Sequence, residues 1–388
     1  MIRVGFIIED NGWLGGLNYF RNLFNAVYNM PERKFELVIF TGKNSSLNLF
    51  SGFPPVEIIH TSYFTRLHPL WMLHKIGYYY FHNDLFLERF LKRHHIDVLS
   101  HANFLSKNSS VPVLGWIPDF QCMYYPKLFS DKGMRSHESN LRLIAKYAQA
   151  VVVSSFDAKK DMGKFMPQYI SKAKVLHFAV VPQNNDSRKN MEYLEDKYNI
   201  HYPYFYVPNQ FWAHKNHKIL IDALNILREK EIPITIVMTG KTVDPRQPEY
   251  FDNLMRYAQE CNVLNKFRVL GIVPYSDVMS LLRNCLAVIN PSFFEGWHTG
   301  VEEARSLGKP TLLSDIPIHR EQDPSGGVFF NPRDSLDLAM KLEEFWSNSN
   351  NEEDAHLKYN VEDATARHQV FAKTYEKIIL ETIKGNYV

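Results

Sequence analysis

Residues 291–315, PSFFEGWHTGVEEARSLGKPTLLSD, decide the fold of this chain. An apolar run at residues 286–290 precedes them and has the composition of a buried strand. The stretch itself begins as a glycine-bearing acidic loop, continues as a short predicted helix and ends in a second apolar run at residues 311–313. In a parallel sheet, this order places the loop and the helix N-terminus at the carboxyl edge. We therefore expect a parallel α/β sheet with a ligand site at that edge.

Acidic residues surround the predicted start of this helix. Glu295 lies in the loop, whereas Glu302 and Glu303 lie in the first helical turns. A helix N-terminus attracts phosphate and carboxylates bind sugar hydroxyls, so the combination indicates a nucleotide-sugar site. Thr299-x-x-Glu302 matches a capping box, which gives Glu302 a structural explanation. Relief of the helix dipole explains Glu303 equally well, but it does not explain Glu295.

The composition bounds the class of protein. A chain of 388 residues is too long for one ordinary core and predicts two domains. Hydrophobic residues make up 45% and charged residues 22%, which is ordinary for a soluble globular protein. The three widely spaced cysteines indicate neither a disulfide framework nor a zinc site, so we expect a cytoplasmic location. No apolar run is long enough to span a membrane.

The net charge of +2 hides a difference between the halves of the chain. Residues 1–190 carry 23 Lys and Arg against 14 Asp and Glu, whereas residues 191–388 carry 21 against 28. A basic first half suits an anionic partner such as a phospholipid surface or a lipid diphosphate, although scattered solvated lysines explain it equally well. Residues 64–90 also interleave aromatic and basic side chains, a pattern of peripheral membrane contact or of buried helix packing.

Strand and helix patterns alternate along both halves. In the first half, strands are expected at residues 4–8, 35–41, 56–60, 97–100, 112–116, 150–154 and 174–180, with helices at 17–28, 79–94 and 141–148. The second half restarts with strands at 204–207, 234–239 and 269–270 and helices at 215–229, 250–261 and 277–283. This alternation predicts two doubly wound, Rossmann-like domains whose carboxyl edges face each other across a cleft. We place the domains at residues 1–185 and 186–364, followed by a helical segment at 365–388.

Three further features lie where such sheets bind ligands. Gly15 and Gly16 follow the first predicted strand, where they allow a phosphate to approach the backbone, although a tight turn explains them nearly as well. Lys215 begins a predicted helix and can reach a diphosphate, the alternative being a solvated helix lysine. Asp119 follows the strand at 112–116 and suits a base or a sugar-hydroxyl acceptor, the alternative being a turn aspartate.

Residues 291–310 resemble the signature of retaining family 4 glycosyltransferases of the GT-B fold. In that signature two glutamates are separated by seven residues, as Glu295 and Glu303 are. The motifs PNQFWAHKNH at residues 208–217 and SDIPIHREQ at 314–322 resemble members that build bacterial surface polysaccharides. The resemblance follows nearly the whole chain in order, specifically in the second half and loosely in the first.

The resemblance implies a role for each site residue. Glu303 would hold the nucleotide ribose, Glu295 would contact the donor sugar and Lys215 would neutralise the diphosphate. The last helix, within residues 365–382, would cross back to the first domain. The remaining donor-binding positions would cap the diphosphate or contact the base and sugar, and they are Gly15, Gly16, Ile272, His298, Thr299, Gly300 and Val301.

The chain departs from the family pattern around the phosphates. Family members usually place an arginine five or six residues before the lysine, where this chain has Gln210 and Asn209. The clamp on the diphosphate therefore has one cation fewer, for which Arg246 or Arg268 is the expected substitute.

Two other departures concern the sugar and the acceptor. His298 stands where a small residue is common, a change expected to alter which sugar fits. The family's frequent histidine in the acceptor loop is absent from WIPDFQ, so Asp119 is the nearest polar candidate there.

The sequence thus predicts a retaining hexosyltransferase that uses a nucleoside-diphosphate sugar, with Glu295, Asp119 and Lys215 as catalytic residues. The acceptor would be a hydroxyl of a glycan or lipid-linked glycan in surface polysaccharide synthesis. GDP-mannose and UDP-hexoses are both open as donors, and no nucleic acid is expected as a partner. No DxD-type metal motif stands at a suitable place, so we expect no metal and no other cofactor. Peripheral contact with the inner face of an anionic membrane is also expected.

Two alternatives remain at this point. A nucleotide-sugar epimerase of the same fold would need further acid and base residues in the cleft. A non-catalytic carbohydrate-binding relative would explain the missing arginine and His298, although Glu295, Glu303 and Lys215 argue for an enzyme.

Overall fold

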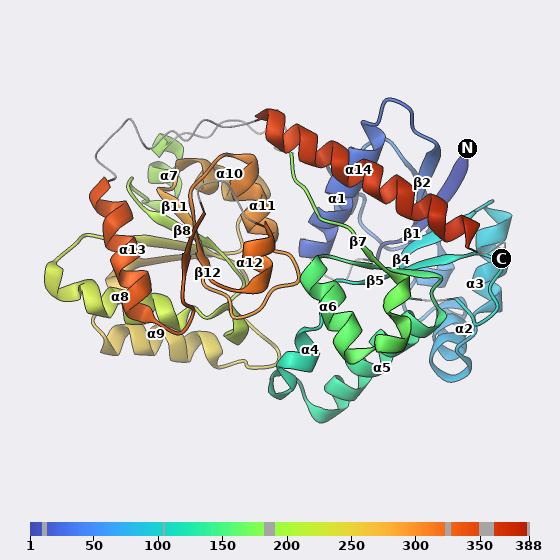
Figure 1. Cartoon of the computed structure of the whole chain (residues 1–388), viewed down its shortest axis with the longest axis horizontal. Helices are drawn as coiled ribbons and strands as arrows, with labels where there is room; N and C mark the ends of the chain where they lie inside the picture. The colour runs from blue at the N-terminus through green and yellow to red at the C-terminus, as the bar shows by residue number, and fades with distance from the viewer. Residues whose placement is uncertain (10–13, 104, 182–190, 323–326, 349–360, 386–388) are drawn as a thin grey trace. The chain divides into compact units, whose positions relative to one another are not determined.

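The computed structural model divides the chain into two compact units, Met1–Ala179 with Ala366–Val388 and Val180–Thr365 (Figure 1). The structure describes residues 1–9, 14–103, 105–181, 191–322, 327–348 and 361–385. The predicted junction near residues 185 and 186 lies outside the described residues.

The first unit contains a seven-stranded parallel sheet in the order β3-β2-β1-β4-β5-β6-β7. The chain moves outward from β1 to β3 and then returns to the other side of β1 with β4. The strand order therefore reverses between β1 and β4, the place where ligands bind such sheets. The strands are β1 (Ile2–Ile7), β2 (Phe35–Gly42), β3 (Glu57–Thr61), β4 (Val98–Ala102), β5 (Val113–Ile117), β6 (Ala150–Val153) and β7 (Ala173–Val175).

The second unit repeats this topology with a six-stranded parallel sheet in the order β10-β9-β8-β11-β12-β13. Its order reverses between β8 and β11, which pair through Ala287 with Phe205 and Val288 with Tyr206. The strands are β8 (Phe205–Pro208), β9 (Ile236–Thr239), β10 (Phe267–Gly271), β11 (Ala287–Asn290), β12 (Thr311–Ser314) and β13 (Gly327–Phe330). The predicted pair of doubly wound Rossmann-like domains is thereby confirmed.

Helices connect the strands in both units. Those of the first unit are α1 (Leu14–Tyr28), α2 (Pro69–Ile76), α3 (Leu85–Arg93), α4 (Gln121–Tyr124), α5 (Asp131–Tyr147) and α6 (Phe156–Phe165). Those of the second are α7 (Met191–Tyr198), α8 (Lys218–Leu227), α9 (Tyr250–Glu260), α10 (Tyr275–Asn284), α11 (Thr299–Ser306), α12 (Pro317–Gln322) and α13 (Ser335–Asn348). None of the described helices combines the length and the apolar content needed to cross a bilayer.

Helices cover both faces of the central strands of the second sheet. Every residue of β11 and β12 is buried, as expected for strands with helices on both sides of a parallel sheet. Such burial leaves only the loops at the strand ends open to ligands.

The long C-terminal helix α14 (Val361–Lys384) returns to the first unit, as predicted for residues 365–382. It buries Phe371, Tyr375 and Ile379, which recur every four residues and therefore share one helical face. The Tyr375 hydroxyl donates to Ser100 Oγ on β4 at 2.8 Å. The helix is thus fastened beside the strand reversal of the first sheet.

One predicted helix is wrong as a single element. Residues 79–94 are divided between a five-residue π-type turn, Gly77–Phe81, and α3. The break has a local cause, because the Asp84 carboxylate accepts the N–H of Leu87 at 3.0 Å and starts α3 there. Six helices, α2, α4, α6, α7, α12 and α13, were not predicted.

Candidate functional site

The two loops at the strand reversal of the second sheet bring Lys215 and Glu295 together. The first loop follows β8 and the second follows β11, and the N–H of Phe293 donates to His214 O at 2.8 Å between them. Lys215 Nζ lies 2.6 Å and 2.8 Å from the two carboxylate oxygens of Glu295. The sequence predicted a helix that begins at Lys215, and this is wrong. Lys215 ends a 3-10 turn, Ala213–Lys215, and α8 starts three residues later.

The ion pair is buried, with side-chain exposures of 10% for Lys215 and 8% for Glu295. Burial alone would raise the pKa of Glu295, but the adjacent Lys215 charge outweighs it and holds that pKa well below its usual range. Glu295 therefore stays ionised, and the two groups neutralise each other. The sequence analysis predicted that Glu295 contacts the sugar and Lys215 the diphosphate, and it did not predict that the two side chains pair.

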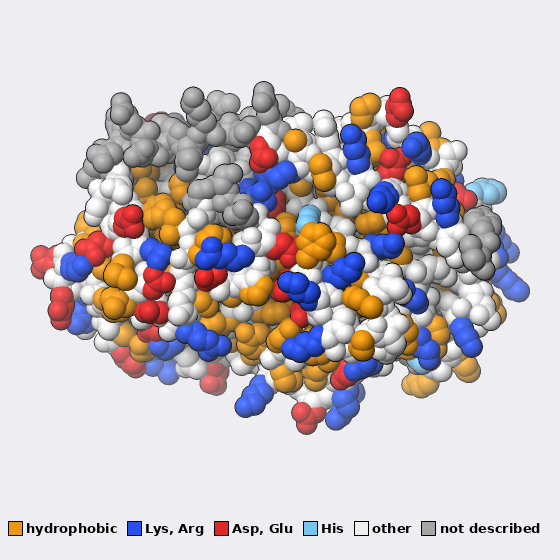
Figure 2. Space-filling view, viewed as in Figure 1, with side chains coloured by type: hydrophobic (Ala, Val, Ile, Leu, Met, Phe, Trp, Pro, Cys, Tyr) orange, Lys and Arg blue, Asp and Glu red, His pale blue; other side chains and the backbone are white. Residues whose placement is uncertain are grey.

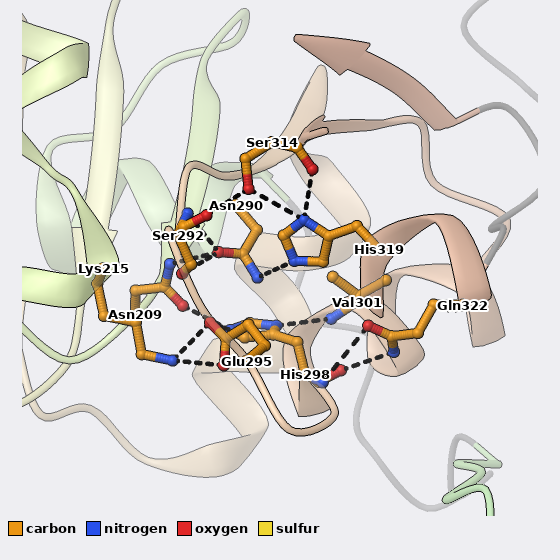
Figure 3. A network of polar contacts seen from close by, with 10 residues as sticks. All are labelled: Asn209, Lys215, Asn290, Ser292, Glu295, His298, Val301, Ser314, His319 and Gln322. Carbon is orange, nitrogen blue, oxygen red and sulfur yellow. Dashed lines mark hydrogen bonds and ion pairs between the residues drawn. The ribbon is translucent and has the colours of Figure 1, made fainter. Parts of the chain in front are cut away.

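His298 links the same two loops to α11 (Figure 3). Its Nδ1 accepts the N–H of Val301 at 3.1 Å, so Nε2 carries the proton and donates to Asn209 Oδ1 at 2.6 Å. Burial lowers the pKa of His298 to about 3 and keeps the ring neutral. The structure gives His298 the role of helix cap, and its predicted effect on the choice of sugar stays a prediction.

The predicted capping box is wrong, because His298 and not Thr299 is the N-cap of α11. Thr299 is the first helical residue. The Glu302 carboxylate instead accepts hydrogen bonds from Arg305 at 3.0 Å and from Gln322 Nε2 at 3.2 Å. Glu302 therefore has a structural role, as expected, but it joins α11 to α12.

The hydrogen-bonded chain continues behind the site (Figure 3). Asn209 Nδ2 donates to Asn290 Oδ1 at 3.1 Å, and Asn290 Nδ2 donates to His319 Nε2 at 3.1 Å. His319 Nδ1 then donates to Ser314 O at 2.8 Å. Burial lowers the pKa of His319 to about 4, so this ring is neutral as well. Each donor and acceptor is fixed in direction, which holds the ends of β8, β11 and β12 in one arrangement.

Sequence reasoning missed this chain of contacts. Asn209, Asn290 and His319 were given no role, although Asn209 and His319 lie in the two motifs that resembled polysaccharide-building enzymes. A polar residue at the end of a predicted strand was the available signal for Asn209 and Asn290, and it was not applied to them.

The start of α11 approaches β8 closely. A Cβ on Gly300 would lie 2.9 Å from both Pro208 Cγ and His298 Cε1, so only glycine fits there without a shift. The N–H of Val301 is already bound by His298. The predicted backbone contact to a diphosphate therefore rests on Thr299 and Gly300, whose N–H groups have no acceptor within the helix.

Glu303 and Ile272 occupy the positions expected at this edge. Glu303 is buried in α11, and its charge contributes, after burial, to raising the pKa of Tyr206 on β8. Ile272 directly follows β10 and exposes 64% of its surface. An exposed apolar side chain at a carboxyl edge suits a nucleotide base, although neither contact is tested by the structure.

Two arginines were considered as substitutes for the missing cation. Of these, Arg246 lies at the carboxyl edge of the second sheet. It follows β9, forms a two-pronged ion pair with Asp244 at 2.9 Å and places its guanidinium 5.0 Å from the centre of the Trp212 ring. Arg268 lies near the beginning of β10 and donates to Asn265 O at 3.1 Å. The beginning of a parallel strand is at the edge opposite to its carboxyl end.

His214 and His217 flank Lys215 but form no metal site. Burial lowers the pKa of His214 to about 2 and that of His217 to about 3. The His217 ring stacks on Phe211 with centroids 4.5 Å apart. Among the described residues, no group of three or more His, Cys, Asp and Glu side chains is placed to hold a metal ion.

The predicted residues of the first unit lie near its own carboxyl edge. Gly15 and Gly16 are in the first turn of α1, which begins at Leu14, and not in a loop before the helix as expected. Residues 10–13, between β1 and α1, are outside the described part of the chain. Asp119 Oδ1 accepts the N–H of Gln121 at 2.8 Å, the contact of a turn aspartate, so its catalytic role stays a prediction.

His101, at the strand reversal of the first unit, has a structural explanation. Its ring nitrogens contact the Tyr19 hydroxyl at 2.7 Å and Ser100 Oγ at 2.9 Å. Burial lowers its pKa to about 3. The ring is therefore neutral and fixed among aromatic neighbours, including Phe6 and Trp116.

The second half of the chain matches a known family model. The match spans residues 194–363 and is described as glycosyl transferases group 1. The matched segment is similar to this family and covers less than half of the chain. It contains both site loops, β8 to β13 and the reversal of strand order at which Lys215 meets Glu295.

Two bacterial proteins are similar in sequence. The chain is 24% identical over 288 residues to the O-antigen chain mannosyltransferase RfbU of Salmonella typhimurium, covering 72% of each protein. It is 27% identical over 176 residues to the serotype-specific mannosyltransferase WbdA of Escherichia coli, which covers 45% of this chain and 21% of that protein.

Solved structures share the fold along almost the whole chain. The Anabaena protein HepE, in complex with UDP and glucose, has a TM-score of 0.69 at 16% identity and covers 98% of this chain and all of its own. WaaG, a glycosyltransferase of lipopolysaccharide biosynthesis, has a TM-score of 0.61 at 14% identity and covers 97% of this chain and 99% of its own. These likenesses confirm the predicted GT-B fold.

Proposed function

We propose that this chain is a glycosyltransferase that moves a hexose from a nucleoside-diphosphate sugar to a hydroxyl of a glycan or lipid-linked glycan. The observation that carries the proposal is the Lys215–Glu295 pair at the strand reversal of the segment that is similar to glycosyl transferases group 1. A cation and a carboxylate at that edge match the two chemical parts of a nucleotide sugar, its phosphates and its hydroxyls. The similarity to two mannosyltransferases of surface polysaccharides supports the substrate class.

In the proposed reaction, the acceptor oxygen forms a bond to the anomeric carbon of the sugar, and the bond from that carbon to the diphosphate oxygen breaks. The electron pair leaves with the nucleoside diphosphate, so negative charge grows on the phosphates. Lys215 and the N–H groups of Thr299 and Gly300 would stabilise that charge. Glu295 would hold sugar hydroxyls, Glu303 the ribose, and Asp119 would accept the proton of the acceptor hydroxyl. Retention of configuration is proposed from the sequence resemblance.

The donor is proposed as GDP-mannose or a UDP-hexose. Similarity to RfbU and WbdA supports a mannosyl donor, whereas the complexes of HepE with UDP and glucose support a uridine donor on the same fold. No described group of metal ligands supports a metal-dependent alternative, and we propose that Lys215 performs the charge neutralisation.

A panel of nucleotides tests the function. We expect one nucleoside diphosphate and its hexose conjugate to raise the melting temperature of the protein. At a ligand concentration of a hundred times Kd, the bound ligand adds about 2.7 kcal/mol to the free energy of unfolding. The same conjugate should be consumed when a glycan acceptor is added, and the Glu295→Gln variant should bind it without transfer. Absence of a shift with every diphosphate would contradict a nucleotide-sugar enzyme. Conversion of the donor into an isomer without an acceptor would favour an epimerase.

Arg246 is proposed as the second cation of the diphosphate site. We expect Arg246→Gln to weaken nucleoside diphosphate binding by about tenfold or more, since a charge-assisted hydrogen bond contributes about 1.5–3 kcal/mol. Binding of the uncharged nucleoside should change little, so the ratio of the two affinities, measured by calorimetry, is the decisive quantity.

Two further variants control this experiment. Arg268→Gln removes the same charge at the opposite edge of the sheet and should leave the affinity ratio unchanged. Asp244 is 3% exposed, so Arg246→Gln leaves a buried carboxylate without its partner. The Asp244→Asn/Arg246→Gln double variant shows whether this unpaired carboxylate causes the loss of diphosphate affinity. Full affinity in that double variant would contradict a phosphate contact by Arg246.

A further inference from the structure

A patch of apolar side chains lies exposed on the first unit, outside the donor site. The described residues expose twenty large apolar side chains in the whole chain, and eight of them lie within twenty residues. We call these the 67–86 patch, which consists of Leu67, Met72, Leu73, Ile76, Tyr80, Phe81, Leu85 and Phe86. Clusters of this kind mark interaction surfaces more often than single exposed residues do.

The backbone holds the patch outward. The π-type turn Gly77–Phe81 places Tyr78 inside, where its hydroxyl donates to Asn140 Oδ1 on α5 at 2.5 Å. Tyr80 and Phe81 of the same turn are 80% and 72% exposed. A Cβ on Gly77 would lie 2.6 Å from Asn83 O, so this tight return of the chain depends on glycine. The exposed rings are therefore presented by an ordered turn.

The exposed charged side chains of residues 66–93 are all basic. Arg66, Arg89, Lys92 and Arg93 are exposed and Lys75 is half-buried. Two acids belong to the same segment, and both are turned inward and paired.

Each of these acids has identified partners. Asp84 is 3% exposed, pairs with His74 Nδ1 and accepts the N–H of Leu87. Glu88 is 7% exposed, accepts the N–H of Ser110 at 3.0 Å and lies 3.4 Å from Lys92. The surface of the segment is thus apolar and cationic at once, the combination that suits an anionic lipid surface.

The patch also has a definite place in the fold. Asp84 N–H donates to Leu105 O at 2.9 Å and Asn83 pairs with Ser106, so the patch is fastened to the segment that follows β4. The patch extends from the residues after β3, through α2, into the first turn of α3 (Figure 1). On the face drawn in Figure 2, Lys and Arg side chains are more frequent than Asp and Glu over this unit.

We propose that the 67–86 patch is a membrane-docking surface that rests on anionic phospholipid, with Tyr80 and Phe81 entering the headgroup layer and the surrounding basic residues binding lipid phosphates. A protein partner or a second copy of the chain would also bury apolar side chains, but neither requires that every exposed charge be basic. The lipid surface accounts for both features of the patch.

Co-sedimentation with vesicles tests this proposal without any donor sugar. The whole chain should bind vesicles of an equal mixture of phosphatidylcholine and phosphatidylglycerol, bind pure phosphatidylcholine more weakly, and be released by added salt. The Tyr80→Ser/Phe81→Ser variant should lose at least about tenfold in partitioning, because two aromatic side chains no longer leave water. The Lys75→Ser/Arg89→Ser variant should lose its preference for the anionic lipid.

Matched variants distinguish binding through this surface from non-specific adsorption to vesicles. Leu336→Ser/Met340→Ser removes an apolar pair from α13 that is 53% and 54% exposed, and Lys132→Ser/Arg135→Ser removes two exposed charges from α5; both variants should bind as the parent does. Unchanged melting temperatures would show that all variants are folded. Equal binding to both lipids, no binding to either, or a dimer abolished by Tyr80→Ser/Phe81→Ser would overturn the proposal.

Discussion

Replacement of Lys215 by methionine is expected to lower kcat/KM for sugar transfer by about 100- to 1,000-fold, the usual cost of removing a group that stabilises charge in a transition state. Methionine keeps most of the volume and removes the charge next to the leaving phosphates. Initial rates measured at low donor concentration give the quantity directly. The exposed Lys218, which pairs with Asp222 at 2.8 Å, is the matched control, and Lys218→Met should leave the rate unchanged.

This variant also has a structural effect that must be separated from the catalytic one. Without Lys215, the Glu295 carboxylate is buried and unpaired, and breaking a buried pair costs about 3–5 kcal/mol. The Lys215→Met/Glu295→Gln double variant removes the unpaired charge and should recover most of the lost stability. If the affinity for the nucleoside diphosphate, lost in Lys215→Met, recovers together with stability, Lys215 is only a structural partner of Glu295 and its proposed role is wrong.

The second unit is expected to lose stability steeply below about pH 6. His214, His217, His298 and His319 are buried, and burial lowers their pKa values to between about 2 and about 4. The unfolded chain takes up protons at these histidines near pH 6.5, whereas the folded chain takes them up only at much lower pH. Stability therefore falls as the pH drops through this window, by about 1.4 kcal/mol per pH unit for each histidine.

Urea unfolding followed by circular dichroism between pH 7 and pH 4.5 measures this slope. His217 has no hydrogen-bond partner at either ring nitrogen among the described residues, so His217→Leu should change stability at pH 7 by only about 1 kcal/mol. The same variant should reduce the slope of stability against pH by the contribution of one histidine, about 1.4 kcal/mol per pH unit. His201 is exposed, and His201→Leu should leave the slope as it is. A flat profile in the parent protein would contradict the neutral, buried state of these rings.

The fold could be predicted from the sequence because its strands are short, apolar and regularly separated by helices. The run at residues 286–290 and the loop after it placed a ligand site at a sheet edge, and the structure brings both loops of that edge together. Lys215 and Glu295 were predicted because each follows a predicted buried strand, and because both fall where the family that the chain resembles has its donor site.

Contacts between distant segments could not be predicted in the same way. Lys215 and Glu295 are 80 residues apart, and their pairing depends on β8 and β11 being neighbours in the sheet. Pattern rules favoured Thr299 as the helix cap, whereas His298 takes that place because Asn209, from another strand end, holds its ring. The break in the helix expected at residues 79–94 depends likewise on a side chain, Asp84, that the periodicity of the apolar residues ignores.

The Lys215–Glu295 pair has a consequence for how the proposed reaction ends. The Glu295 carboxylate is an intramolecular counter-ion for Lys215. A diphosphate that binds Lys215 must compete with it, and after transfer the same carboxylate can take the lysine back. Glu295 would thus act as a built-in competitor of the spent nucleotide, so the site favours release of product over its retention. Weak binding of the nucleoside diphosphate by the parent and tighter binding by Glu295→Gln, measured by calorimetry, is the behaviour that this arrangement implies.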